Sequence, residues 1–142
     1  MSNVNEGVEV VRAALQLVFS EHRLDQIDEL FAADFTQHSP YAPPGGRDSL
    51  KQWWAGQIAV IPDITTTVEQ ILGSGDKVAV FRTVHGTPNH NIPESRIKAS
   101  RQRLQLRAAD IFRVEDGKIA EHWEITDTGP MYQLAVFQRA GR

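Results

Sequence analysis

The chain has 142 residues, with 18 acidic and 15 basic side chains, a formal net charge of -3 and no cysteine. This length lets one domain bury its own core, so we expect a single domain over residues 1–142. The composition excludes disulfides, gives no reason to expect nucleic acid as a partner, and offers no apolar run of the roughly 20 residues that span a membrane. Without a secretory signal pattern, we expect a cytoplasmic protein.

The first half of the chain predicts helices. Apolar residues recur every three or four positions over residues 4–20, 24–33 and 47–61, which is the spacing of amphipathic helices. A short strand is expected at residues 34–39, before the third helix. The segment Pro40 to Gly46 that follows this strand holds three prolines and two glycines, so we expect a loop there.

The second half of the chain predicts strands. Residues 64–72, 77–85 and 101–114 have the composition or the alternation of strands, and residues 86–100 are expected to be a loop. Residues 131–137 fit either a short helix or a strand. We therefore expect an α+β fold: a cone-shaped α+β barrel with a curved antiparallel sheet and three N-terminal helices that cover its concave face.

The strongest local signal is the stretch from Ala108 to Asp127, where two alternating runs flank an Asp-Gly step and predict a long hairpin. Because side chains alternate across a strand, Asp110 and Glu124 look into one cavity if their faces coincide. Repulsion and desolvation would then raise the pKa of at least one carboxyl, so that one could be an acid and the other a base. Alternatively, Asp110 forms a structural ion pair with Arg113 or Arg82.

Two segments carry a resemblance to a known family: FTQHSPYAPPGGRDSLKQWW from Phe35, and DIFRVEDGKIAEHWEITD from Asp110. The chain resembles the SnoaL-like polyketide cyclases of the nuclear transport factor 2-like superfamily. The resemblance implies a cofactor-independent enzyme that performs an intramolecular aldol condensation, or a related proton transfer, on a hydrophobic carbonyl compound. The general acid/base of the cyclases directly follows His-Trp, which makes it Glu124 here. Where the cyclases tend to have His and Gln, this chain has Asp110 and Ala108.

Other activities stay open. A dehydratase or an isomerase would need the same acid/base pair, and a non-catalytic ligand-binding or protein-binding module is the alternative from another class. Epoxide hydrolases of this superfamily place an arginine two residues before one of two acids. This chain has Ala108 at that position, which argues against them.

The pattern and the resemblance together give a set of expected site residues. We expect catalytic roles for Glu124, Asp110 and His38, with His38 at the mouth of the cavity. Substrate contacts are expected from His122, Gln37, Trp54, Tyr41 and Phe112. The resemblance implies no cofactor, and we expect no metal, because the sequence has no close-spaced group of ligands.

Surface features suggest one partner. Trp123 and Ile125 alternate with Glu124, so we expect them on the outer face of the sheet, where large apolar side chains indicate a contact surface. We expect a homodimer through that face. The basic residues between Arg96 and Arg107 are expected to form a solvated polar face, and neither nucleic acid nor membrane is expected as a partner.

Overall fold

The computed structural model describes residues 4–40, 42–88 and 102–140. The predicted loop at residues 86–100 falls mainly outside the described residues, as do Tyr41 and the first half of the basic stretch.

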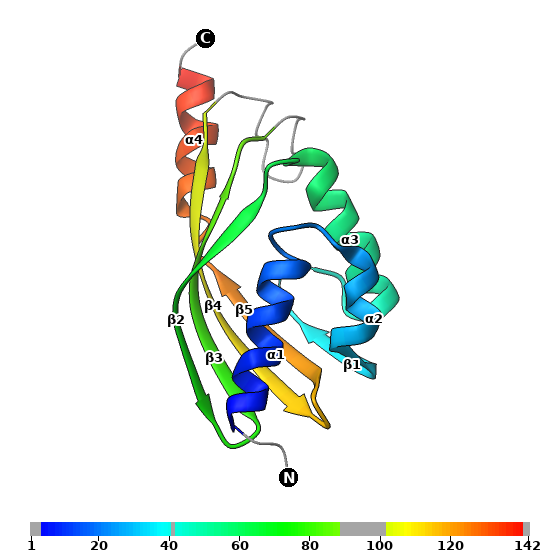
Figure 1. Cartoon of the computed structure of the whole chain (residues 1–142). Coiled ribbons are helices and arrows are strands. Elements are labelled where there is room, and N and C mark those ends of the chain that lie inside the picture. The colour runs from blue at the N-terminus through cyan, green and yellow to red at the C-terminus, as the bar shows by residue number, and fades with distance from the viewer. Residues whose placement is uncertain (1–3, 41, 89–101, 141–142) are drawn as a thin grey trace.

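The described chain folds into helices packed on one mixed sheet. In chain order the elements are α1 (Val4–Leu17), the 3₁₀ turn η1 (Leu24–Gln26), α2 (Ile27–Leu30), β1 (Phe31–His38), α3 (Arg47–Val60), β2 (Thr65–Ser74), β3 (Lys77–Gly86), β4 (Leu104–Glu115), β5 (Lys118–Thr126) and α4 (Gly129–Ala140). The strands lie in the order β1-β5-β4-β3-β2. Helices α1, α2 and α3 cover the concave face of the curved sheet, as predicted (Figure 1).

The α+β fold is confirmed, with one difference in the sheet. Strands β2 to β5 pair antiparallel, but β1 runs parallel to β5, and the sheet does not close. The helix expected over residues 24–33 is also divided, because β1 begins at Phe31. This side chain is fully buried, pairs with Ile119 and packs edge-on against Phe35, so pairing with β5 overrides the local helical pattern.

The hydrophobic core lies between the helices and the concave face of the sheet. Val11 and Leu15 of α1 are buried there with Phe112 and Ile119 of the hairpin. The segment with an undecided prediction is the helix α4, whose Leu134 packs with Leu104 in a separate small cluster at the far end of β4. Among the described residues, no helix is both long and apolar enough to cross a bilayer.

Candidate active site

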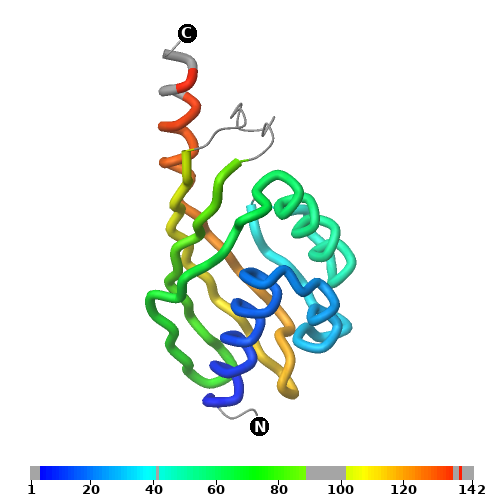
Figure 2. Tube along the Cα trace, turned by 45° about the horizontal axis from the view of Figure 1, so that its top comes forward, coloured from blue at the N-terminus to red at the C-terminus, as the bar shows by residue number. Residues whose placement is uncertain are grey.

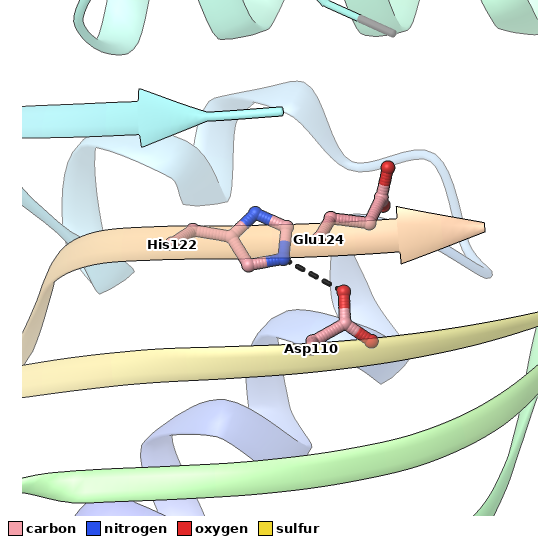
Figure 3. Close-up of side chains that lie close together, drawn as sticks. All are labelled: Asp110, His122 and Glu124. Carbon is pink, nitrogen blue, oxygen red and sulfur yellow. Dashed lines mark hydrogen bonds and ion pairs between the residues drawn. The ribbon is translucent and has the colours of Figure 1, made fainter. Parts of the chain in front are cut away.

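The inward faces of three adjacent strands bring the candidate residues together. Asp110 on β4 and Glu124 on β5 are direct partners in the antiparallel register, so the two acids share one face of the sheet (Figure 3). Phe112 and His122 form the next inward pair. The common face expected for the two arms of the hairpin is therefore confirmed.

Arg82 on β3 joins the two acids. Its Nε and Nη2 donate to the two oxygens of Asp110 at 2.7 and 3.2 Å, and Nη2 also donates to Glu124 Oε2 at 2.7 Å. The sequence indicates Arg82 only as one possible ion-pair partner of Asp110. A clearer signal lies in the alternation of β3, where Arg82 takes an inward position in line with the buried Val78 and Val80.

His122 supports Asp110 from the other side. Its Nε2 lies 2.7 Å from Asp110 Oδ1, its Nδ1 lies 3.0 Å from Gln37 Oε1, and its ring stacks on Phe112 with centroids 4.2 Å apart. His122 thus connects Gln37 to Asp110 in one buried network.

Asp110 does not have the raised pKa that repulsion between two acids would give. Burial alone would raise its pKa, but the charge of Arg82 and the hydrogen bonds from His122 and Arg82 outweigh burial and lower it. The Arg82 pKa is raised: burial lowers it, and the two carboxylates more than compensate. The expectation of a raised pKa is therefore wrong for Asp110, because the guanidinium contacts both acids.

Glu124 differs from Asp110 in exposure. The Asp110 side chain is 0% exposed, whereas that of Glu124 is 10% exposed. Its second oxygen, Oε1, accepts a hydrogen bond of 3.3 Å from the Ser39 hydroxyl, just after β1. Of the two carboxylates, Glu124 is thus the one with some exposed surface.

His38 does not join this cluster. It pairs with Trp123 in the parallel register of β1 and β5, stacks on that ring at 5.1 Å between centroids, and lies 2.9 Å from Glu121 Oε2. Its neighbours belong to the outer face of the sheet, whereas Glu124 belongs to the inner face. The position expected for His38, at the mouth of a cavity shared with Glu124, is therefore corrected.

Three of the expected substrate contacts, in contrast, lie inside the protein. Trp54 packs edge-on against Phe19 and donates its indole N–H to the Val18 carbonyl at 2.9 Å. Phe112 has no exposed surface, and Gln37 is buried against His122. These positions are those of core and supporting residues. Tyr41 lies outside the described residues.

Asp110, His122 and Glu124 each offer a potential metal ligand, and these atoms lie within 4.8 Å of one another. The donor set nevertheless fits a resident cation poorly. Arg82 already pairs with both carboxylates, and the ring nitrogen of His122 nearest Asp110 is engaged with that carboxylate. A metal ion would have to displace the guanidinium.

Arg82 also bears on the comparison with epoxide hydrolases. Position 108 lacks the arginine of their pattern, but Arg82 is the direct partner of Ala108 on the neighbouring strand and contacts both acids. The alanine is therefore no longer evidence against an acid–arginine–acid arrangement. What counts against epoxide opening is Asp110 itself, because a buried carboxyl with a lowered pKa is poorly suited to protonate an epoxide oxygen.

Comparison with solved structures shows the same fold in several bacterial proteins. IdmH from Streptomyces antibioticus, provisionally assigned as a polyketide cyclase, is 26% identical and has a TM-score of 0.78, covering 96% of this chain and 99% of its own. A provisionally assigned polyketide cyclase from Bacillus cereus is 25% identical, with a TM-score of 0.76 and coverages of 92% and 80%. One from Acidithiobacillus ferrooxidans, at 20% identity, TM-score 0.82 and coverages of 96% and 99%, shows likeness of fold alone.

No curated protein matches the chain. The sequence model of the SnoaL-like domain family, in contrast, matches residues 11–122, from helix α1 to His122 on β5. The chain belongs to the SnoaL-like domain family.

Proposed function

We propose that the protein is a cofactor-independent acid/base enzyme in which Glu124 transfers a proton to and from a hydrophobic carbonyl compound, as in an aldol-type cyclisation. The observation that carries this proposal is the difference in exposure between the two acids. Glu124 is partly exposed and held through both oxygens, whereas Asp110 has no exposed surface. General bases must reach the proton that they remove.

The proposed reaction needs one group that both accepts and returns a proton. Ionised Glu124 removes a proton from the carbon next to a carbonyl, and the electron pair of that C–H bond forms an enolate. The enolate carbon then attacks a second carbonyl carbon of the same molecule, so that a C–C bond forms and the C=O π electrons move to oxygen. Glu124 returns its proton to this oxygen. The overall change is an isomerisation of the substrate without a redox step.

The buried residues behind Glu124 position it in this proposal. Arg82 orients the carboxylate through a 2.7 Å contact, Asp110 holds Arg82 through two contacts, and His122 holds Asp110. Fixed geometry of this kind supports catalysis because it removes the cost of orienting the base during the reaction. Asp110 and His122 are thus positioning residues, and His38 has no part in the proposed reaction.

A dehydratase or an isomerase would use Glu124 for the same first step. The three reactions differ in the fate of the enolate: attack on a second carbonyl, loss of a hydroxyl group, or return of the proton to another carbon. The first step can therefore be tested before the natural substrate is identified.

The test measures proton removal directly. The bicyclic ketone β-tetralone is incubated in D₂O with the protein, and deuterium incorporation next to its carbonyl is followed by NMR. We expect the wild-type protein to exceed buffer, and Glu124→Gln to lose roughly 100-fold or more of the acceleration. Glu121→Gln, on the same strand but on the outer face, is the matched control and should retain it.

Two results would count against the proposal. One is exchange by the wild-type protein no faster than in buffer, for β-tetralone and for larger aromatic ketones. The other is full exchange activity in a folded Glu124→Gln variant. Mass spectrometry of small molecules that co-purify with the protein then identifies compounds for assays of the complete reaction.

A further inference from the structure

A groove lies at one edge of the sheet, between helix α1 and strand β2. We call it the α1/β2 groove; it has a volume of about 290 Å³ and is lined by Arg12, Leu15, Gln16, Thr66 and Val68. Strand β2 is the last strand of the sheet, and α1 lies beside it (Figure 2). None of the lining residues has a part in the proposed reaction.

The groove combines apolar side chains with one unpaired charge. Leu15 is 2% exposed and Val68 is half-buried, so both can pack against an apolar group. Arg12 is exposed, and within the described part of the chain it has neither an ion pair nor a hydrogen bond. One helical turn further on, the amide nitrogen of Gln16 donates to Glu21 at 2.8 Å. The charge that the lining residues leave unpaired is therefore positive and lies at the Arg12 end.

The hydroxyl of Thr66 is the second polar group that a ligand could use. Its Oγ1 accepts a hydrogen bond from Arg82 Nη1 and donates one to the Thr83 carbonyl, both at 3.4 Å. These distances are long for hydrogen bonds, so neither contact holds the hydroxyl firmly. Arg82 separates Thr66 from the two acids, which it contacts through its other nitrogens. The hydroxyl can thus turn toward a molecule in the groove.

The backbone beside the groove is already paired. The N–H of Thr66 donates to Ser20 Oγ at 3.1 Å, and the Thr66 carbonyl accepts from the same hydroxyl at 3.3 Å. His22 Nε2 lies 2.6 Å from the carbonyl oxygen of Ile64. A peptide that adds a strand to a sheet needs free backbone groups at the edge, and these positions offer none. The groove therefore suits a small molecule that binds through side chains.

We propose that the α1/β2 groove binds a small organic monocarboxylate, with its carboxylate on Arg12 and its apolar chain between Leu15 and Val68. A guanidinium matches a carboxylate through two parallel hydrogen bonds. The volume is at the lower end of the range of about 300–1,000 Å³ for ligand pockets, which favours a chain of a few carbons over a polycyclic molecule.

The charge of the groove favours a carboxylate over a phosphate. A phosphate dianion would need a second cation, and Arg82 does not supply one, because its two carboxylate partners balance its charge. The inferred ligand is thus a single negative charge on an apolar chain.

An NMR titration with sodium hexanoate tests the proposal. In ¹H–¹⁵N spectra of the wild-type protein, millimolar hexanoate should shift the backbone amides of the lining residues. 1-Hexanol has the same chain without the charge and should bind about tenfold more weakly. Arg12→Met removes the charge of an exposed side chain and should weaken hexanoate binding about tenfold. The matched control is Arg23→Met, at an arginine outside the groove whose side chain is 49% exposed, and it should bind like the wild type.

Thr66→Val tests the second contact. The substitution keeps a β-branched side chain of similar shape, removes the hydroxyl and should weaken hexanoate binding about threefold. Circular dichroism verifies that each variant is folded. The proposal is overturned by lining amides that do not shift at about 50 mM hexanoate, by 1-hexanol that binds as tightly as hexanoate, or by a folded Arg12→Met variant that binds like the wild type. Because the measurement is of binding, its outcome does not depend on the proposed proton transfer by Glu124.

Discussion

The two faces of strands β3 to β5 both place side chains in unusual environments: charged groups are buried on one face, and apolar groups are exposed on the other. Their inner face, covered by helices, carries Arg82, Asp110 and His122 as buried charged or polar groups. Their outer face carries exposed apolar groups, including Phe81 and Ile125. Neighbours in the sequence thus face opposite ways: Asp110 lies between Ala109 and Ile111, and Glu124 lies between Trp123 and Ile125. One alternating pattern supplies both surfaces.

The two environments are unfavourable for different physical reasons. Buried charges are costly unless they are paired, and the inner groups provide one another's partners within the chain. Exposed apolar area is costly in water, and the described part of the chain leaves Phe81 and Ile125 exposed. The inner face should therefore respond strongly to single substitutions, whereas the outer face should respond weakly.

The largest expected effect is that of Arg82→Met. Removal of the guanidinium leaves Asp110 and Glu124 close together without their shared cation. Loss of one partner from a buried ion pair typically costs about 3–5 kcal/mol, and we expect a loss of that size in the free energy of urea-induced unfolding. Arg113→Met on the outer face is the matched control, with an expected loss below about 1 kcal/mol. Equal losses in the two variants would contradict the comparison of the faces.

The importance of Arg82 shows where prediction from the sequence reached its limit. The hairpin and its two acids were predictable, because a turn fixes which residues of adjacent arms share a face. Arg82 precedes Asp110 by 28 positions, and their contact depends on the register of β3 against β4, which no local signal gives. The sequence named Arg82 as one of two possible ion-pair partners of Asp110, but it did not indicate that the same guanidinium also contacts Glu124.

The sequence did not predict the position of His38, and the reason is related. Its face is set by the parallel pairing of β1 with β5, and this pairing joins segments more than 80 positions apart. The same pairing explains why the helix expected over residues 24–33 ends early. Local periodicity predicted helical structure correctly up to Leu30, but from Phe31 onward the buried contact with the sheet determines the conformation.

The next largest effect concerns Asp110 and pH. Its pKa is lowered in the folded protein, so it contributes stability above the ordinary aspartate value of about 3.9 and loses that contribution as pH falls through the lower folded value. We expect Asp110→Asn to lose about 1.5–3 kcal/mol at neutral pH, because hydrogen bonds to a charged group are replaced by weaker ones.

The difference in unfolding free energy between wild type and Asp110→Asn should shrink below about pH 4. Urea unfolding of both proteins at neutral and acidic pH measures it. A difference that stays constant, or grows on acidification, would show that Asp110 is not held in its ionised form by Arg82 and His122.

A smaller effect is expected at Gln37, which contacts the end of the buried network. Gln37→Leu removes the polar partner of His122 Nδ1, and a buried polar atom without a hydrogen-bond partner costs about 1–3 kcal/mol. Gln105→Leu, at an exposed position on β4, is the control and should be nearly neutral. A Gln37→Leu variant as stable as the wild type in urea unfolding would contradict this role of the contact between Gln37 and His122.

The smallest effect is expected at Ile125, which is 71% exposed on the outer face of β5. Ile125→Thr keeps a β-branched side chain suited to a strand, and the position buries little area. We therefore expect the free energy of urea-induced unfolding to change by less than about 0.5 kcal/mol. A loss as large as that of Gln37→Leu would show that the outer face contributes to the stability of the chain as much as the buried network does, which would contradict the comparison of the two faces.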